Sequence, residues 1–152
     1  MKKIIIIAAS VMCVVAFLLF MAQECGTGAA YPSYVGTWQS IDPTTRIDST
    51  MTADSGESHV YNWDGETWGY IFGMRMDISF SGDTNTGTVT EVSDDGTNWY
   101  SSGIVWDTII NGPLGGQTKL TSTYAVSPTG NYMFTHQVQP DQSVMMWMMT
   151  KQ

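Results

Sequence analysis

Residues 74–80 read MRMDISF, and this stretch shows most clearly which secondary structure the chain favours. Met74 and every second residue after it are apolar, while the residues between them are polar. Successive side chains of a β-strand point to opposite faces, so this pattern gives one buried face and one face in water. We therefore predict an antiparallel strand here, in a sheet that is solvated on one side.

The same period of two recurs on both sides of this stretch, between turn signals that come every ten to seventeen residues. The signals are Asp54-Ser55-Gly56, Asp64-Gly65, Ser81-Gly82-Asp83, Asp94-Asp95-Gly96, Asn111-Gly112-Pro113, Ser127-Pro128-Thr129-Gly130 and Pro140-Asp141. This spacing is typical of hairpins, so we expect about nine strands and almost no helix after residue 30. The predicted fold is all-β: a single antiparallel up-and-down β-barrel of about 8–10 strands over residues 34–152, with a sandwich as the alternative.

The two ends of this region indicate how a barrel closes. Pairing a first strand at 34–41 with a last strand at 143–150 removes the unpaired edges of the sheet, which favours the barrel. The last strand belongs to SVMMWMMTKQ (143–152) and has no polar face, because both of its alternating sets of side chains are apolar. We expect one set to point into the barrel and the segment 31–34 to cover the other.

Residues 1–24 have the pattern of a signal peptide or a membrane anchor, since two lysines precede an apolar run from Ile4 to Ala22. Residues 25–33 are predicted to be a flexible tether. Cys25 is the only cysteine after the apolar run, and its position resembles the lipidated cysteine of bacterial lipoproteins. The resemblance implies a lipid anchor at Cys25; cleavage after Ala30 and an uncleaved anchor helix are the alternatives. All three place the barrel outside the cytoplasm, in a bacterial cell envelope.

The chain beyond this segment is strongly acidic. The whole sequence has 6 Lys+Arg and 14 Asp+Glu; without Lys2, Lys3 and Glu24 there remain 4 and 13, a net charge of minus nine. Such a surface repels phosphate backbones, so we expect no nucleic-acid partner.

A short motif at the head of the first predicted strand carries a family resemblance. Gly36-Thr37-Trp38 has the pattern Gly-x-Trp, and at the start of a β meander it resembles the lipocalins, more closely the small lipocalin-like domains of exported bacterial lipoproteins. The resemblance implies a barrel whose closed end is plugged by Trp38 under a basic side chain from the last strand, for which Lys151 is the candidate. It also implies a small apolar ligand inside the barrel.

The inward faces of the predicted strands then supply the ligand-binding residues. The predicted set is Trp38, Met51, Met76, Phe80, Trp106, Tyr124, Phe134 and Met146. Alternation does not distinguish a hollow barrel from one that is filled by its own side chains, so both forms remain open. In a filled barrel the function moves to the surface, and the alternative is a surface adhesin or interaction module that binds protein or carbohydrate through exposed aromatics and methionines.

The chain contains no pattern that indicates catalysis. It has no Ser/His/Asp set, no nucleophilic cysteine, no phosphate loop and no zinc-type Cys/His spacing. Its paired acids, at 64–66 and 94–95, fall in predicted turns rather than on one face of a strand. We therefore expect a non-enzymatic protein without a cofactor or a metal. The eleven methionines leave one alternative, a Cu(I) site formed by Met146 and Met148 with Met74, Met76 or His136, against their ordinary role as core or cavity lining.

Overall fold

The computed structural model describes residues 33–81, 84–139 and 142–152. The predicted signal or anchor, the tether with Cys25 except its last residue Ser33, and the first two residues of the covering segment 31–34 lie outside these ranges. Pro32–Gln152 form one compact unit, and every strand pair and both apolar clusters lie within it.

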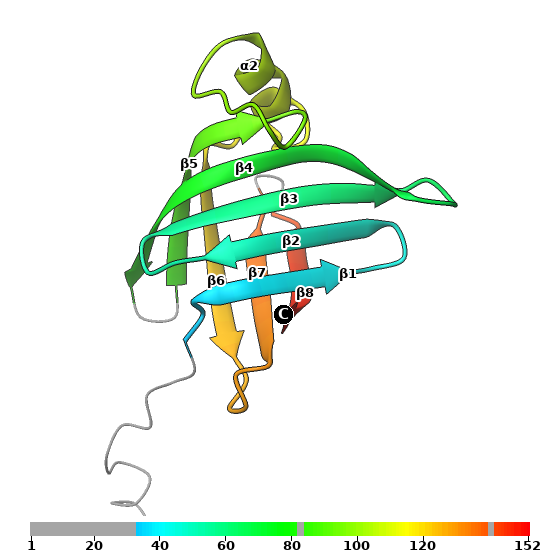
Figure 1. Ribbon diagram of the computed structural model, residues 1–152. Helices are drawn as coiled ribbons and strands as arrows, with labels where there is room; N and C mark the ends of the chain where they lie inside the picture. The colour runs from blue at the N-terminus through cyan, green and yellow to red at the C-terminus, as the bar shows by residue number, and fades with distance from the viewer. Residues whose placement is uncertain (1–32, 82–83, 140–141) are drawn as a thin grey trace, which may run out of the picture. The chain divides into compact units, whose positions relative to one another are not determined.

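Eight antiparallel strands form a closed barrel in the order of the chain (Figure 1). The elements are β1 (Gly36–Ile41), β2 (Thr45–Met51), β3 (Ser55–Trp63), β4 (Trp68–Ser81), β5 (Thr84–Ser93), α2 (Ile104–Asn111), β6 (Lys119–Val126), β7 (Tyr132–Val138) and β8 (Val144–Lys151). The prediction of an all-β, up-and-down antiparallel barrel is confirmed. The stretch 74–80 lies in β4, and its apolar residues point into the barrel as the alternation predicts.

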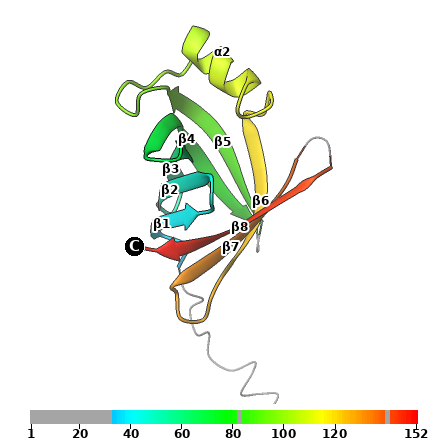
Figure 2. The same ribbon diagram turned by 90° about the vertical axis from the view of Figure 1, so that its right-hand side faces the viewer.

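The helix α2 corrects the expectation of almost no helix after residue 30. It connects β5 to β6 and lies at one end of the barrel (Figure 2). Val105, Trp106, Ile109 and Ile110 pack against the apolar cluster beneath it, and two glycines, Gly103 and Gly112, bracket the helix. The i, i+4 spacing of this stripe is helical, but β-branched residues and tryptophan also favour strands, which obscured the signal.

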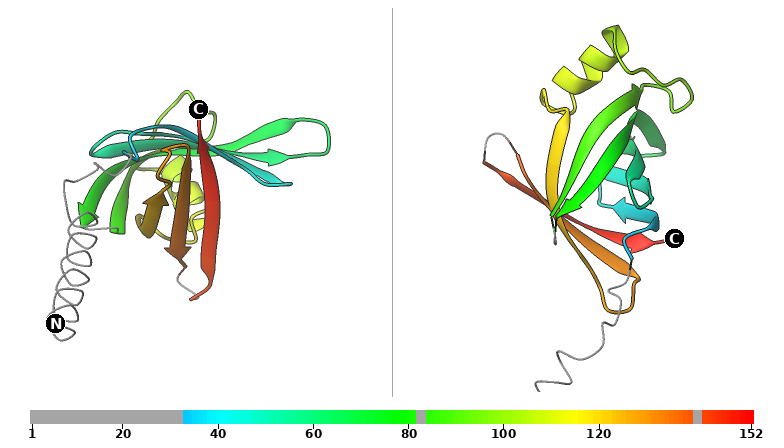
Figure 3. Two further views of the ribbon diagram at one scale, coloured as in Figure 1. Left: turned by 90° about the horizontal axis from the view of Figure 1, so that it is seen from below. Right: turned by 90° about the vertical axis from the view of Figure 1, so that its left-hand side faces the viewer.

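The barrel closes through a short contact between its first and last strands. β1 pairs with β8 only at Trp38–Lys151 and Gln39–Thr150, and the backbone N–H of Gln152 adds one bond to the carbonyl of Thr37 at 2.9 Å. Figures 1 and 3 show the reason, since β8 runs steeply across the direction of β1. The rest of β8, 144–149, is hydrogen-bonded to β7 but not to β1.

Trp38 fills the end of the barrel at which this contact lies. Its side chain is fully buried among Met133 and Met149, and its indole N–H donates to the carbonyl of Tyr34 at 2.7 Å. The Nζ atom of Lys151 lies 5.4 Å from the centre of the indole ring. Gly36 makes room for this lysine, because a Cβ atom there would lie 2.9 Å from the Lys151 Cε. A tryptophan under a basic side chain is the arrangement that the Gly-x-Trp resemblance implies.

We predict that Trp38→Ala lowers the free energy of unfolding by about 3–5 kcal/mol, the usual cost of removing a fully buried large side chain. The measurement is urea unfolding of residues 32–152, followed by circular dichroism. Ile104→Ala is the matched control: Ile104 is 86% exposed, so this change stays within about 0.5 kcal/mol. If the two variants lose the same free energy of unfolding, Trp38 does not plug this end of the barrel.

Candidate functional site

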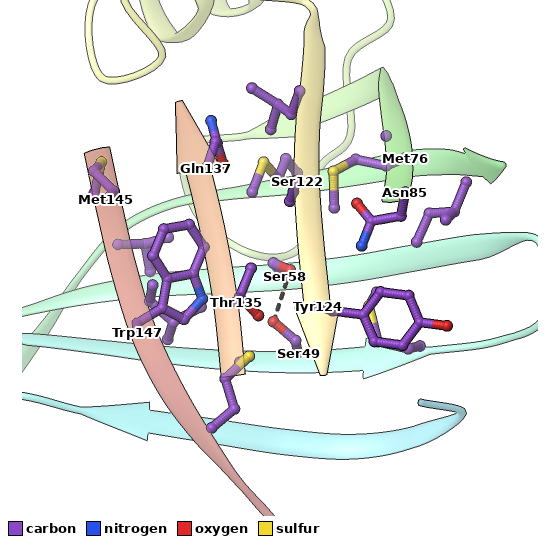
Figure 4. Close-up of a pocket in the computed structure, with 18 of the residues that line it drawn as sticks. Ser49, Ser58, Met76, Asn85, Ser122, Tyr124, Thr135, Gln137, Met145 and Trp147 are labelled. Carbon is purple, nitrogen blue, oxygen red and sulfur yellow. Dashed lines mark hydrogen bonds between the residues drawn. The ribbon is translucent and has the colours of Figure 1, made fainter. Parts of the chain in front are cut away.

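The barrel is hollow between its two apolar clusters, with a cavity of about 300 Å³ (Figure 4). Every strand except β1 contributes to its wall, together with Tyr34 and the turn after α2. Most of the wall is apolar and consists of methionine, aromatic and branched aliphatic side chains. This volume is at the small end of the range for ligand-binding pockets.

Three aromatic rings form the floor of the cavity above Trp38. Tyr34 stacks on Phe80 with ring centres 4.0 Å apart, and Tyr124 meets both rings edge-on at 5.4 and 5.3 Å. The Tyr34 hydroxyl donates to the carbonyl of Ala53 at 2.9 Å, so its polar end is satisfied away from the cavity. The floor therefore presents mainly ring surface to the cavity.

The opposite end of the cavity lies under α2 and the turn that follows it. Pro113 and Leu114 of that turn, with Phe72 and Leu120, form an apolar ceiling. Gln117 also lines this end, and its side-chain amide donates to the Gln139 side chain at 3.4 Å. Amide groups thus occur in the wall at the α2 end, whereas rings close the other end.

The remaining polar groups in the wall are neutral. Ser49 and Ser58 form a mutual hydrogen bond of 2.8 Å, while Asn85, Ser122, Thr135 and Gln137 are distributed along β5, β6 and β7 (Figure 4). None of the Asp, Glu, Lys, Arg and His side chains in the described ranges lines the cavity.

The structure brings four of the eight predicted ligand-binding residues into the cavity wall. These are Met51, Met76, Phe80 and Tyr124. Trp38 lies beneath the floor in the apolar cluster, and Trp106 lies in α2, where it packs on the cluster at the other end. Sequence reasoning treated residue 106 as part of a strand, which is wrong because the chain is helical there.

Phe134 and Met146 point away from the cavity, with 52% and 77% of their surfaces exposed. Residues directly opposite in an antiparallel pair share a face of the sheet. Because Tyr124 points inward and pairs with Thr135, Thr135 is also inward and its neighbour Phe134 is outward. The strand pairing, which alternation within one strand does not reveal, therefore reverses the predicted orientation of β7.

The same register decides the two apolar faces of β8. Met145, Trp147 and Met149 line the cavity, although Met145 is also half exposed, whereas Val144, Met146 and Met148 are exposed and do not line it. The expectation that 31–34 covers this outer face is wrong for Tyr34, which lies in the cavity floor. Phe134 and Val138 of β7 stand opposite Met148 and Val144, so these strands share an exposed apolar strip. We call it the β7–β8 outer face; it comprises Phe134, Val138, Val144, Met146 and Met148.

The aromatic-rich stretch 59–70 lies on the outside of β3 and β4, where its rings pack on one another. Tyr61 meets Tyr70 edge-on at 5.4 Å, and Trp63 meets Trp68 at 5.3 Å. The Arg46 guanidinium lies 4.1 Å from the centre of the Tyr61 ring. These contacts occupy faces that a sugar ring needs for stacking, so they fit the cross-strand pairs that stabilise sheets.

The candidate acids serve as acceptors within turns. One oxygen of Asp64 accepts the backbone N–H groups of Glu66 and Thr67 at 2.8 and 2.7 Å. One oxygen of Asp95 accepts those of Asn98 and Thr97, each at 2.7 Å, and these bonds lower the pKa of Asp95 to about 2. Carboxylates held in this way stabilise turns and are poor proton donors at neutral pH.

The candidate Cu(I) ligands do not all come together. Met74 and Met76 line the cavity, whereas Met146 and Met148 lie on the outer face of β8, where Met146 stands opposite His136. Within the described ranges, no three His, Cys, Asp or Glu side chains gather where a metal ion would bind.

Among the residues that the structure describes, no helix has the length and apolar character needed to cross a bilayer. No family model, curated protein or solved structure matches the chain.

Proposed function

We propose that this barrel is a non-enzymatic, lipocalin-like binding domain that holds one small, mainly apolar molecule in its central cavity. The observation that carries the proposal is the cavity itself: about 300 Å³ of space between an aromatic floor and an apolar ceiling. Filling such a space with a ligand removes apolar surface from water and restores the dispersion contacts that an empty cavity lacks.

The methionines of the wall support a binding role. Met51, Met74 and Met76 lie on one side of the cavity, and Met133, Met145 and Met149 lie on β7 and β8. Methionine has an unbranched, polarisable side chain, so it adapts its shape to an irregular apolar surface at little cost. A wall of this kind suits a ligand that is held by apolar contact rather than by a rigid set of hydrogen bonds.

A second candidate function rests on the β7–β8 outer face. Its five apolar residues are each about half exposed or more, on adjacent strands, and together they form a contiguous strip. Contiguous exposed apolar surface is typical of interaction sites. In this alternative the barrel is an adhesin-like or complex-forming module that binds protein or carbohydrate through this strip.

The proposed location is the cell envelope, outside the cytoplasm, with the barrel held to a membrane by a lipid on Cys25 or by an uncleaved anchor helix. The support is the order of lysines, apolar run and lone cysteine in residues 1–25.

We predict that an environment-sensitive neutral probe, N-phenyl-1-naphthylamine, binds residues 32–152 saturably with about one site per monomer, and that Met76→Trp weakens this binding about tenfold or more by filling the cavity. The matched control is Met146→Trp, which adds the same ring to the outer face. Fluorescence titration with each folded variant is the measurement. Equal binding by the two variants places the probe outside the cavity and contradicts the proposal.

For the second candidate, we predict that Met148→Lys abolishes any self-association or partner binding of the barrel, because it places a charge in the β7–β8 outer face. Probe binding in the cavity stays unchanged. Sedimentation velocity at increasing protein concentration measures the association. A wild-type barrel that stays monomeric, together with a variant that keeps all binding partners of the wild type, excludes this strip as an interaction site.

For the anchor, we predict that the full chain, expressed in a bacterium, incorporates labelled palmitate and that Cys25→Ser abolishes the incorporation. Cys13→Ser is the matched control and retains the label, because Cys13 lies within the apolar run. Label that persists in the Cys25 variant contradicts lipidation at this residue, and absence of label in the wild type favours cleavage elsewhere or an uncleaved helix.

A further inference from the structure

The charged side chains of the described residues lie outside the cavity, where they form ion pairs or are exposed to solvent. Arg46 pairs with Asp48 at 3.0 Å, and Arg75 bridges Glu57 and Glu91 at 2.7 and 3.0 Å. The hydrogen bonds of this bridge raise the pKa of Arg75 further. Of the other two described cations, Lys119 is exposed on β6 and Lys151 lies over Trp38, beneath the cavity floor.

A charged ligand group would therefore enter a wall that offers no counter-charge. Burying an ion without a partner is strongly unfavourable, because neutral groups replace only part of its hydration. The net negative charge of the chain adds repulsion for an anion in particular. An ionised carboxylate, phosphate or ammonium group inside this cavity would therefore lose hydration without gaining a charged partner.

The wall does offer neutral hydrogen-bonding groups, and Gln137 is the clearest of them. It is 92% buried, being 8% exposed, and it lines the cavity. No described residue forms a hydrogen bond with its side-chain amide. A carboxamide that faces a cavity in this state is a ready donor and acceptor for a ligand. Figure 4 shows Gln137 on β7, near Ser122 of β6.

The polar groups also give the cavity a direction. Gln137 pairs with Ser122 and Met145, and the Gln117–Gln139 hydrogen bond lies further toward α2. The opposite end is the stack of Tyr34, Phe80 and Tyr124, whose rings offer apolar surface. A ligand with one polar end fits best with that end toward Gln137 and its apolar body on the aromatic floor.

We propose that the cavity selects an uncharged amphiphile: a molecule with an apolar body and a neutral hydrogen-bonding end, such as a hydroxyl, carbonyl or carboxamide, which binds to Gln137. This inference rests on the proposed binding function and adds the chemical class of the ligand. Gln137 acts as the specificity-determining residue, since it can donate to and accept from the same neutral group.

The test compares ligands that share a decyl chain and differ only in their end group. Decanol, decanamide, decanoate and decylammonium are each titrated against the barrel loaded with N-phenyl-1-naphthylamine, at pH 7.5, where the last two are ionised. We expect decanol and decanamide to displace the probe at concentrations at least about tenfold lower than decanoate and decylammonium. Tryptophan fluorescence, to which Trp147 in the wall contributes, gives a second readout that does not depend on the probe.

Gln137→Lys tests the role of the residue itself. A lysine there supplies the missing counter-charge, so the preference shifts toward decanoate and away from decylammonium, while decanol binding falls. Gln152→Lys is the matched control, because it adds the same charge at the exposed C-terminus and leaves the preferences unchanged. Gln117→Lys, at a less buried position of the same end, replaces the first variant if that one does not fold.

The outcomes separate this inference from the proposed function. If the probe binds in the cavity but all four decyl ligands displace it equally, or the ionised ones displace it better, the cavity binds apolar molecules without the proposed selection, and the inference is wrong. If neither the probe nor any decyl ligand binds, the binding function itself fails. Selection that survives in Gln137→Lys assigns the polar end to another group of the wall and overturns the role of Gln137.

Discussion

The contact of Lys151 with Trp38 is the constraint on which the rest of this barrel depends. It joins the last strand to the first at the only place where these strands pair, and it seals the buried tryptophan beneath the cavity floor. Gly36 leaves room for this contact, since a Cβ atom there would lie 2.9 Å from the Lys151 Cε and the lysine side chain would have to shift. β1 and β8 cross steeply and pair only at Trp38–Lys151 and Gln39–Thr150 (Figure 3). The cavity lies between this end of the barrel and the turn after α2.

The sequence predicted the barrel, and four of the eight residues predicted to bind a ligand line its cavity; the strands explain why the other four do not all follow. Met51, Met76 and Phe80 belong to strands whose alternation has one apolar face, so their inward orientation follows from the pattern. In β7 the more apolar of the two alternating sets of side chains, which includes Phe134, points outward. Pairing with β6 decides which of the two sets faces the cavity. No alternation rule for one strand contains that information. Gln137 was missed for the same reason, since a glutamine is expected on the wet face.

The helix α2 was not predicted from the sequence for a different reason. Residues 104–111, IVWDTIIN, are apolar and largely β-branched, so their local preference is for a strand. Their environment is the open end of the barrel, where β5 extends beyond its partner β6 and leaves Val89 and Val92 to be covered. A helix covers this area with one stripe, and burial of Ile109 and Ile110 outweighs the weak local preference. Tertiary packing therefore decided that this segment forms a helix, and the residues on which it packs are distant in the sequence.

The size of the cavity is set by flexible side chains, and this bears on how the barrel distinguishes ligands. Gly87 lies in the wall beside Met76, and Gly56 lies beside Met51; a Cβ atom at either glycine would lie 3.0 Å from a methionine sulfur. The glycines thus leave the room that these thioether ends occupy. A wall of this kind changes shape at little cost. The shape of a ligand's apolar body therefore has little effect on how tightly the ligand binds. Charge discriminates strongly, because rearranging methionines does not supply a counter-ion. Selection by end group, with tolerance for the shape of the body, is therefore the specificity that this combination of residues favours.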